Sequence, residues 1–409
     1  MNANSFSLPS DVHVLAGASG TVVCRIAVPF ASEVMSALDS LSKRLLAHPS
    51  VREFPDIVTF AFWCRRANLA QKESVWRAQS GTYPHVGRGL VFHVAPSNVP
   101  INFAYSFVFS LLAGNSNIVR VPSKDFAQVT LVCSAINEVF AEYSKLLASN
   151  SFVRYASEGD TTAQISACAD GRVLWGGDAT VSHIRALPSS PRCIDIAFPD
   201  RYSIALISAD SVACLDEASL QALAAAFYND TYLMDQNACS SPQVLFWVDD
   251  NKDGRERFWQ ALTLHAQEKY DLQSAVSVDK YVKLCEDTLQ GTGVGSAKTY
   301  NPYLTHVDIT DRLQQKDSSS LTLSDFRGTG GYFYEAAISS VGEALAFVSQ
   351  KYQTLVYFGL NPLDLAEALI ATKAQGIDRI VPIGEALSID IIWDGYDLIG
   401  QLSRIIEVR

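Results

Sequence analysis

A cysteine surrounded by small and polar residues is the first feature of this sequence that could do chemistry. Cys239 lies in the segment Asp235–Pro242, between a helical pattern and an apolar run. A thiol in such a loop can be partly exposed, and backbone N–H groups around it can stabilise the thiolate. We therefore treat Cys239 as a candidate nucleophile. A buried loop thiol without a chemical role leaves the same signature, so the segment alone does not decide between the two.

An asparagine in a stiff turn is the second such feature. Asn98 follows the apolar run Leu90–Ala95 and lies between Pro96 and Pro100, which restrict the backbone of the turn. Held there, its side-chain amide can donate to an oxygen that becomes negatively charged during a reaction. Asparagine is also common in turns because of its own backbone contacts, so an ordinary turn residue is the alternative.

Two further segments are suited to a nucleotide. Arg120, Ser123 and Lys124 follow a second apolar run, where two cations and a hydroxyl suit an adenosine ribose or its phosphate. The glycines of Gly176–Asp178 let a cofactor approach the backbone, and the aspartate can cap the next helix. Taken alone, a solvated strand end and a plain strand-to-helix turn also explain these segments.

An alternation of strands and helices must position these segments. Short apolar runs predict strands, and apolar residues three or four apart predict helices. The strands expected first are 90–95, 117–121, 152–155 and 172–175, with helices at 101–113, 126–148 and 161–168 between them. This βαβαβ order predicts an α/β fold with an open, mostly parallel sheet and helices on both faces. Ligands of such sheets bind beyond the carboxyl ends of the strands, where the candidate loops lie.

The rest of the chain continues the alternation after a mostly helical lead-in that ends near Ser80. The later strands are expected at 201–210, 243–248 and 354–358, and the later helices at 217–227, 255–269, 341–349 and 362–374. Polar or glycine-rich stretches at 317–322 and 327–331 predict loops. We find no internal repeat, and we place a domain boundary near residue 210.

Composition excludes several classes of protein. The chain has 409 residues, 48% of them hydrophobic and 18% charged, which suits a globular protein of two domains. A net charge of −11 disfavours nucleic acid as a partner. The N-terminal residues do not form a signal peptide, and no apolar run is long enough to span a membrane. We therefore expect a cytoplasmic protein.

The eight cysteines are spread along the chain. They include no CxxC pair and no cysteine/histidine cluster at the spacing of a zinc site, so we expect no metal. A disulfide framework is not expected in a large cytoplasmic protein. Most of the cysteines, including Cys133 and Cys214 within apolar runs, should be small buried hydrophobic residues.

The order of the candidate segments resembles the aldehyde dehydrogenase superfamily, and within it the bioluminescence-type long-chain acyl-CoA reductase family. The segments that carry the likeness read HVAPSNVP, LLAGNSNIVRVPSK, WGGDATV, DQNACSSPQ, KYQTLVYFG, DRIVPIGEAL and IWDGYDL. The likeness runs from about residue 85 to the C-terminus, and FWCRRANL extends it toward the N-terminus. Several motifs in the right order are far more specific than any one of them.

The resemblance implies a role for each candidate. Cys239 is the implied nucleophile and Asn98 the implied oxyanion donor. The residues implied to bind the cofactor are Ser97, Arg120, Ser123, Lys124, Gly176, Gly177 and Asp178. The implied fold is a Rossmann-type cofactor domain beside a smaller α/β catalytic domain. We accordingly expect a cofactor domain with its helical lead-in at 1–209, a catalytic domain at 210–378, and a return and oligomerisation segment at 379–409.

Departures from the superfamily pattern specify the expected reaction. Aldehyde dehydrogenases carry a glutamate that activates water, whereas the corresponding stretch here, Ala197–Arg201, has none. An enzyme that exchanges its acyl group with a thiol does not need that base, so reduction of an acyl thioester is favoured over aldehyde oxidation. Lys124 stands where the superfamily has a carboxylate that repels a 2′-phosphate, which favours NADPH over NADH. A second superfamily glutamate is absent near Arg327–Gly331.

The sequence therefore predicts an NADPH-dependent acyl-CoA reductase that forms an acyl-enzyme on Cys239 and releases an aldehyde. The expected donor is an acyl-CoA or an acyl carrier protein thioester. The expected assembly is a homo-oligomer, with an acyl-transferring or activating enzyme as a further partner. The alternatives are an NAD(P)-dependent aldehyde dehydrogenase, a non-catalytic subunit that retains the fold, and an acyltransferase that uses Cys239 without redox chemistry.

Overall fold

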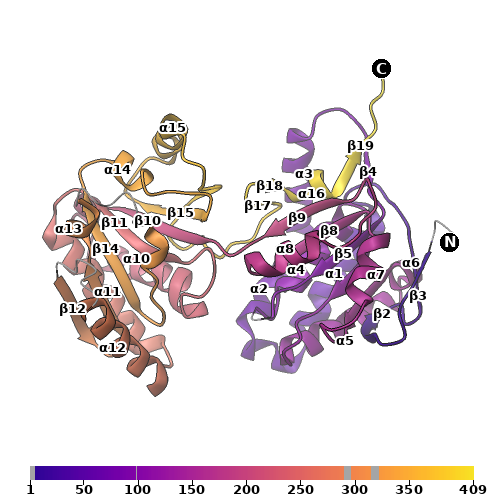
Figure 1. The fold of residues 1–409 in the computed structure, drawn as a ribbon, viewed down its shortest axis with the longest axis horizontal. Coiled ribbons are helices and arrows are strands. Elements are labelled where there is room, and N and C mark those ends of the chain that lie inside the picture. Colours follow the sequence, from indigo (N-terminus) through magenta and orange to yellow (C-terminus); the bar gives the residue numbers. More distant parts are fainter. Residues whose placement is uncertain (1–4, 98, 290–295, 315–321) are drawn as a thin grey trace. The chain divides into compact units, whose positions relative to one another are not determined.

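The chain folds into two compact units, seen in a computed structural model that describes residues 5–97, 99–289, 296–314 and 322–409 (Figure 1). The first unit consists of Met1–Pro199 and Ile391–Arg409, and the second of Asp200–Asp390. The chain thus enters the second unit once and returns to the first near its C-terminus. The three-part division with functional labels that the sequence suggests stays a prediction.

The first unit is built on a sheet with the strand order β2-β7-β6-β5-β8-β9. Its strands are β2 (His13–Gly17), β5 (Leu90–Val94), β6 (Ser116–Arg120), β7 (Asn150–Arg154), β8 (Gly171–Trp175) and β9 (Ile194–Phe198). All neighbouring strands are parallel except β2, which runs antiparallel to β7. The chain moves outward from β5 to β6 and β7, then crosses back to β8 on the other side of β5. Loops at such a reversal of strand order are where open α/β sheets bind ligands.

Helices cover this sheet, and the described part of the unit also contains short two-stranded sheets. The helices are α1 (Ser32–Leu46), α2 (Pro55–Trp63), α3 (Arg66–Gln79), α4 (Asn102–Leu112), α5 (Ala127–Phe140), α6 (Ser144–Ser149), α7 (Thr161–Cys168), α8 (Asp178–Arg185) and α16 (Leu398–Leu402). The short strand pairs are β1 (Ser5–Ser7) with β3 (Thr21–Val23), β4 (His85–Gly87) with β19 (Ser403–Ile405), and β17 (Ile392–Trp393) with β18 (Tyr396–Asp397).

The central strand β5 is buried on both faces, as its unbroken apolar run predicts. Leu90 and Phe92 pack in one apolar cluster with side chains of α7 and α8. On the other face the His93 ring lies 2.7 Å from the Ser106 hydroxyl of α4 and 3.0 Å from the Asn117 amide oxygen. Burial lowers the pKa of His93 to about 4, so the ring is a neutral member of the core.

One expectation for the first unit is wrong, and another holds but is incomplete. The single helix expected at 126–148 is divided into α5 and α6, because Tyr143 adopts a non-helical backbone between them. The apolar spacing continues through both helices, so the pattern hides the break. The lead-in is mostly helical, as expected, but it also contains the short strands β1, β2 and β3. Strand β2 is held by contacts distant in sequence: the Gly17 N–H donates to the Asn137 side chain at 2.9 Å, and that side chain donates to the Leu15 carbonyl at 3.0 Å.

The second unit is built on a sheet with the strand order β12-β13-β14-β11-β10-β15-β16. Its strands are β10 (Tyr202–Ser208), β11 (Pro242–Val248), β12 (Ser296–Asn301), β13 (Leu304–Asp308), β14 (Tyr332–Ile338), β15 (Tyr352–Phe358) and β16 (Arg379–Pro382). Strand β12 is antiparallel to β13, and the other neighbours are parallel. Its helices are α9 (Ala209–Ala213), α10 (Glu217–Thr231), α11 (Lys252–Lys269), α12 (Ser274–Leu289), α13 (Thr310–Gln314), α14 (Val341–Leu345) and α15 (Pro362–Thr372).

Two apolar layers hold helices against the two faces of this sheet. In β11, Leu245 and Trp247 pack with α9, α10 and α11, whereas Val244 and Phe246 pack with α13, α14 and α15. This alternation follows from the two-residue period of a strand. Helix α12 also packs on the second layer through Leu284. The sequence did not lead us to expect α12 or β14, and both turn out to border the candidate site.

Candidate active site

Exposure alone does not distinguish Cys239 from the other cysteines. The buried ones are Cys64 and Cys133, the partly buried ones Cys24, Cys193 and Cys285, and the exposed ones Cys168, Cys214 and Cys239. The expectation that most cysteines are buried core residues is therefore wrong. Cys168 is the last residue of α7 and Cys214 caps the end of α9, so helix ends leave them in contact with solvent despite their apolar neighbours in sequence.

The backbone of the Cys239 loop contains two successive left-handed residues. The loop joins η2 (Tyr232–Met234) to β11, and within it Asp235 and Gln236 have φ values of 50° and 60°. Non-glycine residues in this region cost roughly 1–2 kcal/mol each, so contacts outside the loop must hold the conformation. The Tyr270 hydroxyl supplies one by donating to the Asp235 carboxylate at 2.6 Å. Burial, and then this carboxylate, raise the pKa of Tyr270, which keeps the hydroxyl a donor.

Two glutamine side chains fasten the loop to the segment that precedes β14. The buried Gln236 amide accepts from the Gly331 N–H at 2.7 Å and the Tyr332 N–H at 3.2 Å, and it donates to the Tyr332 carbonyl at 3.2 Å. Gln243 donates to the Gln236 carbonyl at 2.7 Å and accepts from the Gly328 N–H at 3.1 Å. Since buried amides of this kind are costly to leave unpaired, the two segments are positioned together.

A serine from a neighbouring strand holds the backbone of Cys239 itself. The Ser203 hydroxyl, on β10, donates to the Cys239 carbonyl at 2.7 Å and accepts from the Thr354 N–H of β15 at 3.2 Å. Strands β10 and β15 are hydrogen-bonded neighbours in the middle of the sheet. The nucleophile candidate is therefore anchored through its backbone to two strands inside the sheet, while the residue itself stays exposed.

The backbone carbonyl of Asp230 holds the far end of the same loop, and the Asp230 carboxylate in turn holds a separate segment. The Ser241 hydroxyl donates to the Asp230 carbonyl at 2.6 Å. The Asp230 carboxylate accepts the N–H groups of Gly384 at 2.6 Å and Ala386 at 2.9 Å. Burial raises the pKa of Asp230 to about 6, Glu385 adds to the increase, and the two N–H groups oppose it.

The candidates of the first unit lie at the carboxyl ends of adjacent parallel strands. Ser97 follows β5 and is exposed. Asn98 lies outside the described residues, so its role as an oxyanion donor stays a prediction. After β6, the Arg120 guanidinium lies 4.6 Å from the centre of the Tyr155 ring, and the Lys124 ammonium lies 5.2 Å from that of Phe126.

The glycine loop after β8 leaves room for a ligand. Gly176 has a φ of 158°, and a Cβ there would lie 3.3 Å from the Thr180 side chain. A Cβ added to the exposed Gly177 would meet no atom within 4 Å. Gly177 occupies the N-cap position of α8, and Asp178 is the first helical residue, so the expectation that Asp178 caps the helix is wrong.

This edge of the sheet has the features of a dinucleotide site. Exposed Ser123 and Lys124 offer a hydroxyl and a cation, and Gly176 and Gly177 leave the backbone of the next loop accessible. The loops follow β5, β6 and β8, which surround the reversal of strand order. The residues present therefore fit a nicotinamide dinucleotide by position and by chemistry.

Solved structures with the same fold include aldehyde dehydrogenases. Lactaldehyde dehydrogenase from Escherichia coli matches with a TM-score of 0.60 and 13% identity, over 91% of this chain and 85% of that chain. An NAD-dependent benzaldehyde dehydrogenase from Corynebacterium glutamicum matches with a TM-score of 0.59 and 13% identity, over 93% of this chain and 85% of that one. The fold is therefore aldehyde dehydrogenase-like, as the sequence predicts.

The family is narrower than the fold. The acyl-CoA reductase (LuxC) family matches residues 68–282, which is more than half of the chain, and the chain belongs to that family. A long-chain acyl-protein thioester reductase 2 of Photobacterium leiognathi is 27% identical over 170 residues, which is 41% of this chain and 33% of that protein. The corresponding reductase of Photobacterium phosphoreum is 28% identical over 183 residues, 44% of this chain and 35% of that protein. These matches thus span about a third of each relative.

The described residues contain neither a membrane-spanning helix nor a metal cluster. No described helix has the length and apolar character needed to cross a membrane. Within the described ranges, no three histidine, cysteine, aspartate or glutamate side chains are grouped so that they could hold a metal ion.

The residues that sequence reasoning missed are those that hold Cys239 in place. Gln236, Gln243 and Ser203 act through partners about 36 to 96 positions away. In the sequence, these supports are marked only by two glutamines near the ends of the cysteine loop, and no simple spacing rule predicts their hydrogen-bond partners.

Proposed function

We propose that this protein reduces an acyl thioester to an aldehyde with NADPH through an acyl-enzyme on Cys239. The observation that carries the proposal is the exposed cysteine in a loop that buried hydrogen bonds fix. A nucleophile held in one geometry does not have to be ordered again in each turnover. Membership of the acyl-CoA reductase family supports the same reaction class.

The covalent steps balance without water. The Cys239 thiolate adds to the carbonyl carbon of the donor, and an N–H of its loop and the Asn98 amide stabilise the oxygen as it becomes negative. The bond from the carbonyl carbon to the donor sulfur breaks, and the donor leaves as a thiol after taking up a proton. The bound cofactor supplies a hydride equivalent to the acyl carbon. The bond to Cys239 then breaks, which releases the aldehyde and restores the thiolate.

The first unit binds the cofactor in this proposal. Arg120, Ser123 and Lys124 hold the adenosine ribose, and the cation of Lys124 attracts a 2′-phosphate, so NADPH is preferred to NADH. Ser97, Gly176, Gly177 and Asp178 border the nicotinamide half. Asp178 suits that half better than the pyrophosphate, because a carboxylate at the first position of α8 repels phosphate.

Hydrolysis of the acyl-enzyme is disfavoured by the surroundings of Ala197–Arg201. The carboxylate of that stretch, Asp200, lies 3.6 Å from the Arg327 guanidinium, and Arg201 is paired with Asp378. Neither side chain replaces the glutamate that activates water in aldehyde dehydrogenases. This supports reduction of the acyl-enzyme by hydride over oxidation of an aldehyde to an acid.

The names of the relatives support the choice of donor. Two of them are named for the reduction of acyl-protein thioesters. We therefore propose that the acyl group arrives as a thioester on a thiol carrier, either coenzyme A or a protein. A homo-oligomer, and a complex with an enzyme that transfers or activates the acyl group, are part of the same proposal.

The test is acyl-CoA-dependent oxidation of NADPH by the wild type, Cys239→Ala and Cys214→Ala. Cys214 is the matched control, because it is an exposed cysteine of the same unit. We expect the Cys239→Ala rate to fall to background and the Cys214→Ala rate to equal the wild type. Activity that survives in Cys239→Ala contradicts the proposal. Acid formed from aldehyde without a thiol would identify a dehydrogenase instead. Acyl transfer that is independent of NADPH would identify an acyltransferase.

A further inference from the structure

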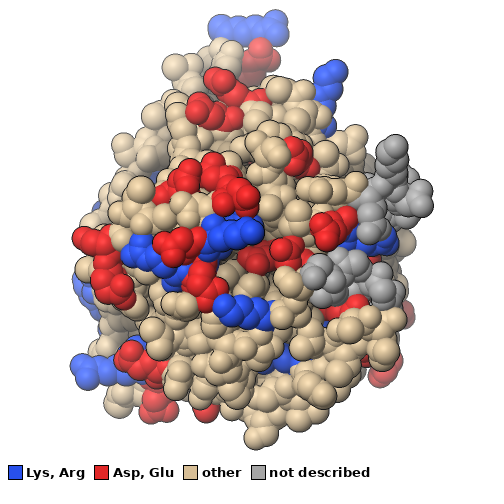
Figure 2. Space-filling view, turned by 90° about the vertical axis from the view of Figure 1, so that its left-hand side faces the viewer, with Lys and Arg blue, Asp and Glu red and all other residues tan. Residues whose placement is uncertain are grey.

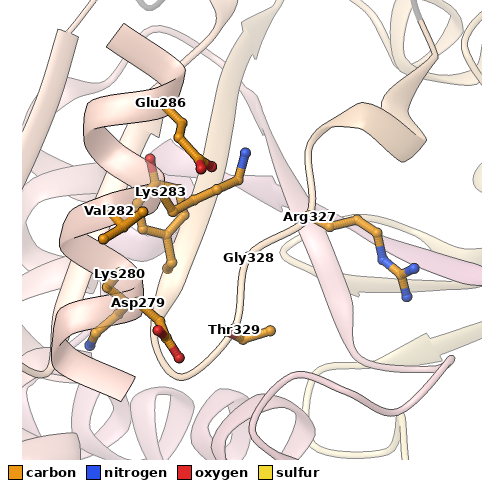
Figure 3. A pocket seen from close by; sticks show the side chains of 9 residues that line it. Asp279, Lys280, Val282, Lys283, Glu286, Arg327, Gly328 and Thr329 are labelled. Carbon is orange, nitrogen blue, oxygen red and sulfur yellow. The ribbon is translucent and has the colours of Figure 1, made fainter. Parts of the chain in front are cut away.

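A cavity of about 290 Å³ lies within the second unit and has no part in the reaction described above. One wall is the segment Arg327–Thr329 together with Tyr332, the first residue of β14. The other wall is α12, which lines the cavity with Asp279, Val282, Lys283 and Glu286 among others. Figure 3 shows Lys283 and Glu286 extending from the helix toward the Arg327–Thr329 segment.

The first wall is the segment that the cysteine loop holds. Gln243 accepts the Gly328 N–H at 3.1 Å, Gln236 accepts the Gly331 N–H at 2.7 Å, and the Asp235 carbonyl accepts the Gly330 N–H at 3.3 Å. The cavity and the candidate nucleophile are therefore positioned by one hydrogen-bonded network.

The charges around the cavity are nearly balanced. Lys283 is paired with the buried Asp287 at 2.6 Å, and Arg327 lies 3.6 Å from Asp200 and points away from α12 (Figure 3). Lys280 donates to the Pro302 carbonyl instead, and burial lowers its pKa to about 8. Acidic and basic side chains also alternate over the described residues of the face in Figure 2. A phosphate would need an excess of cations, so the cavity suits a neutral polar ligand.

We infer that this cavity binds the pantetheine arm of the acyl donor, an inference that rests on the proposed thioester reduction. Pantetheine is an uncharged chain with two amides, a hydroxyl and a pair of methyl groups. Asp279 and Glu286 accept hydrogen bonds from its amide N–H groups, Lys283 donates to its carbonyls, and Val282 packs against its methyl groups. The volume is at the low end of ligand pockets, roughly 300–1,000 Å³, which suits one arm rather than a whole coenzyme.

The arm is common to coenzyme A and to acyl carrier proteins, so the cavity accepts either source. Comparing acyl-CoA with an acyl carrier protein that carries the same acyl group identifies the physiological donor. If the protein recognises the arm, a larger side chain that fills the cavity should weaken the binding of both donors.

The test compares Val282→Trp with Val278→Trp. Both valines lie on α12 and are about half exposed, 48% and 59%, but only Val282 lines the cavity. The substrates are acyl-CoA, acyl-pantetheine and the ethanethiol thioester of the same acyl group. We expect Val282→Trp to lower kcat/KM for the first two about tenfold or more, mainly through KM, and to leave the ethanethiol thioester near wild type. Val278→Trp should leave all three unchanged.

Each of the following outcomes overturns the inference. An equal loss with the ethanethiol thioester means that the substitution disturbed the cysteine loop. A rise in the KM for NADPH instead of the KM for the thioester means that the cavity belongs to the cofactor. If the wild type oxidises no NADPH with any thioester, the proposed function fails, and the cavity is then tested by binding alone. Pantetheine should bind Cys239→Ala and bind the Cys239→Ala/Val282→Trp double variant at least about tenfold more weakly; equal or undetectable binding overturns the inference.

Discussion

Replacing Gln236 by methionine removes the hydrogen bonds that hold the cysteine loop while keeping a side chain of similar length. The Gly331 N–H, buried and paired with Gln236 at 2.7 Å, loses its acceptor. The Tyr332 N–H keeps a second acceptor, the Thr329 carbonyl at 3.2 Å. The loss is therefore dominated by one unpaired buried donor, with smaller contributions from the contacts to Tyr332.

The expected magnitude follows from these contacts. An unpaired buried N–H costs roughly 1–3 kcal/mol, and an ordinary hydrogen bond contributes roughly 0.5–1.5 kcal/mol. We therefore expect Gln236→Met to lower the free energy of unfolding of the second unit by about 2–4 kcal/mol. Because the Cys239 backbone is held through the same loop, kcat should fall on the order of tenfold or more even where the protein is fully folded.

The assay combines unfolding with hydrogen exchange. Denaturant unfolding followed by the fluorescence of Trp247 and Trp259 reports on the core of the second unit. Amide exchange in peptides that contain Gly331 reports on the loop contact itself. The matched control is Gln353→Met, because Gln353 is buried in the same unit and its side-chain oxygen has no hydrogen-bond partner among the described residues. If Gln236→Met costs no more than Gln353→Met and leaves Gly331 exchange unchanged, the glutamine contacts do not hold the loop.

Two further predictions concern the cofactor and the dependence on pH. Lys124→Glu should shift the ratio of kcat/KM for NADPH to that for NADH toward NADH by about tenfold to a hundredfold, because a carboxylate repels a 2′-phosphate and accepts a hydrogen bond from the ribose hydroxyl. Steady-state kinetics with both cofactors measures this ratio. An unchanged ratio rules out a contact between Lys124 and the 2′-phosphate. The folded-state pKa of Asp230, about 6, lies above its ordinary value of 3.8, so its stabilising contribution is fully present below pH 3.8 and is lost as the pH rises through 6. The free energy of unfolding of the wild type relative to Asp230→Asn should thus fall by about 2–3 kcal/mol between these pH values, and an increase over the same range would show that the pKa is lowered instead.

Sequence patterns predicted the parts of the fold whose signals are local. The run Leu90–Ala95 with the helix and strand that follow it was enough to predict a parallel sheet, since a strand buried on both faces is continuously apolar. Strand β2 was missed because the contacts that hold it, such as that of Gly17 with Asn137, join residues 120 positions apart. Helix α12 was missed because Val278 and Tyr281 are apolar but exposed, so its pattern does not mark one buried face.

The candidate site divides in the same way. Cys239 could be singled out because it lies among small and polar residues in the sequence, and the structure leaves it exposed. Its supports could not, since Ser203 lies on a separate strand and Gln236 ties the cysteine loop to Gly331, 95 positions away. The expectation that most cysteines are buried failed because apolar neighbours in sequence do not ensure burial at a helix end, as Cys214 shows.

The intact mass of the protein after mixing with an acyl-CoA in the absence of NADPH tests the central claim most directly. The wild type should gain the mass of one acyl group, and peptide mapping should place that group on Cys239. Adding NADPH should remove the added mass and release one aldehyde per acyl group. A wild-type protein that gains no acyl group, or a Cys239→Ala variant that still gains one, would contradict an acyl-enzyme on this cysteine.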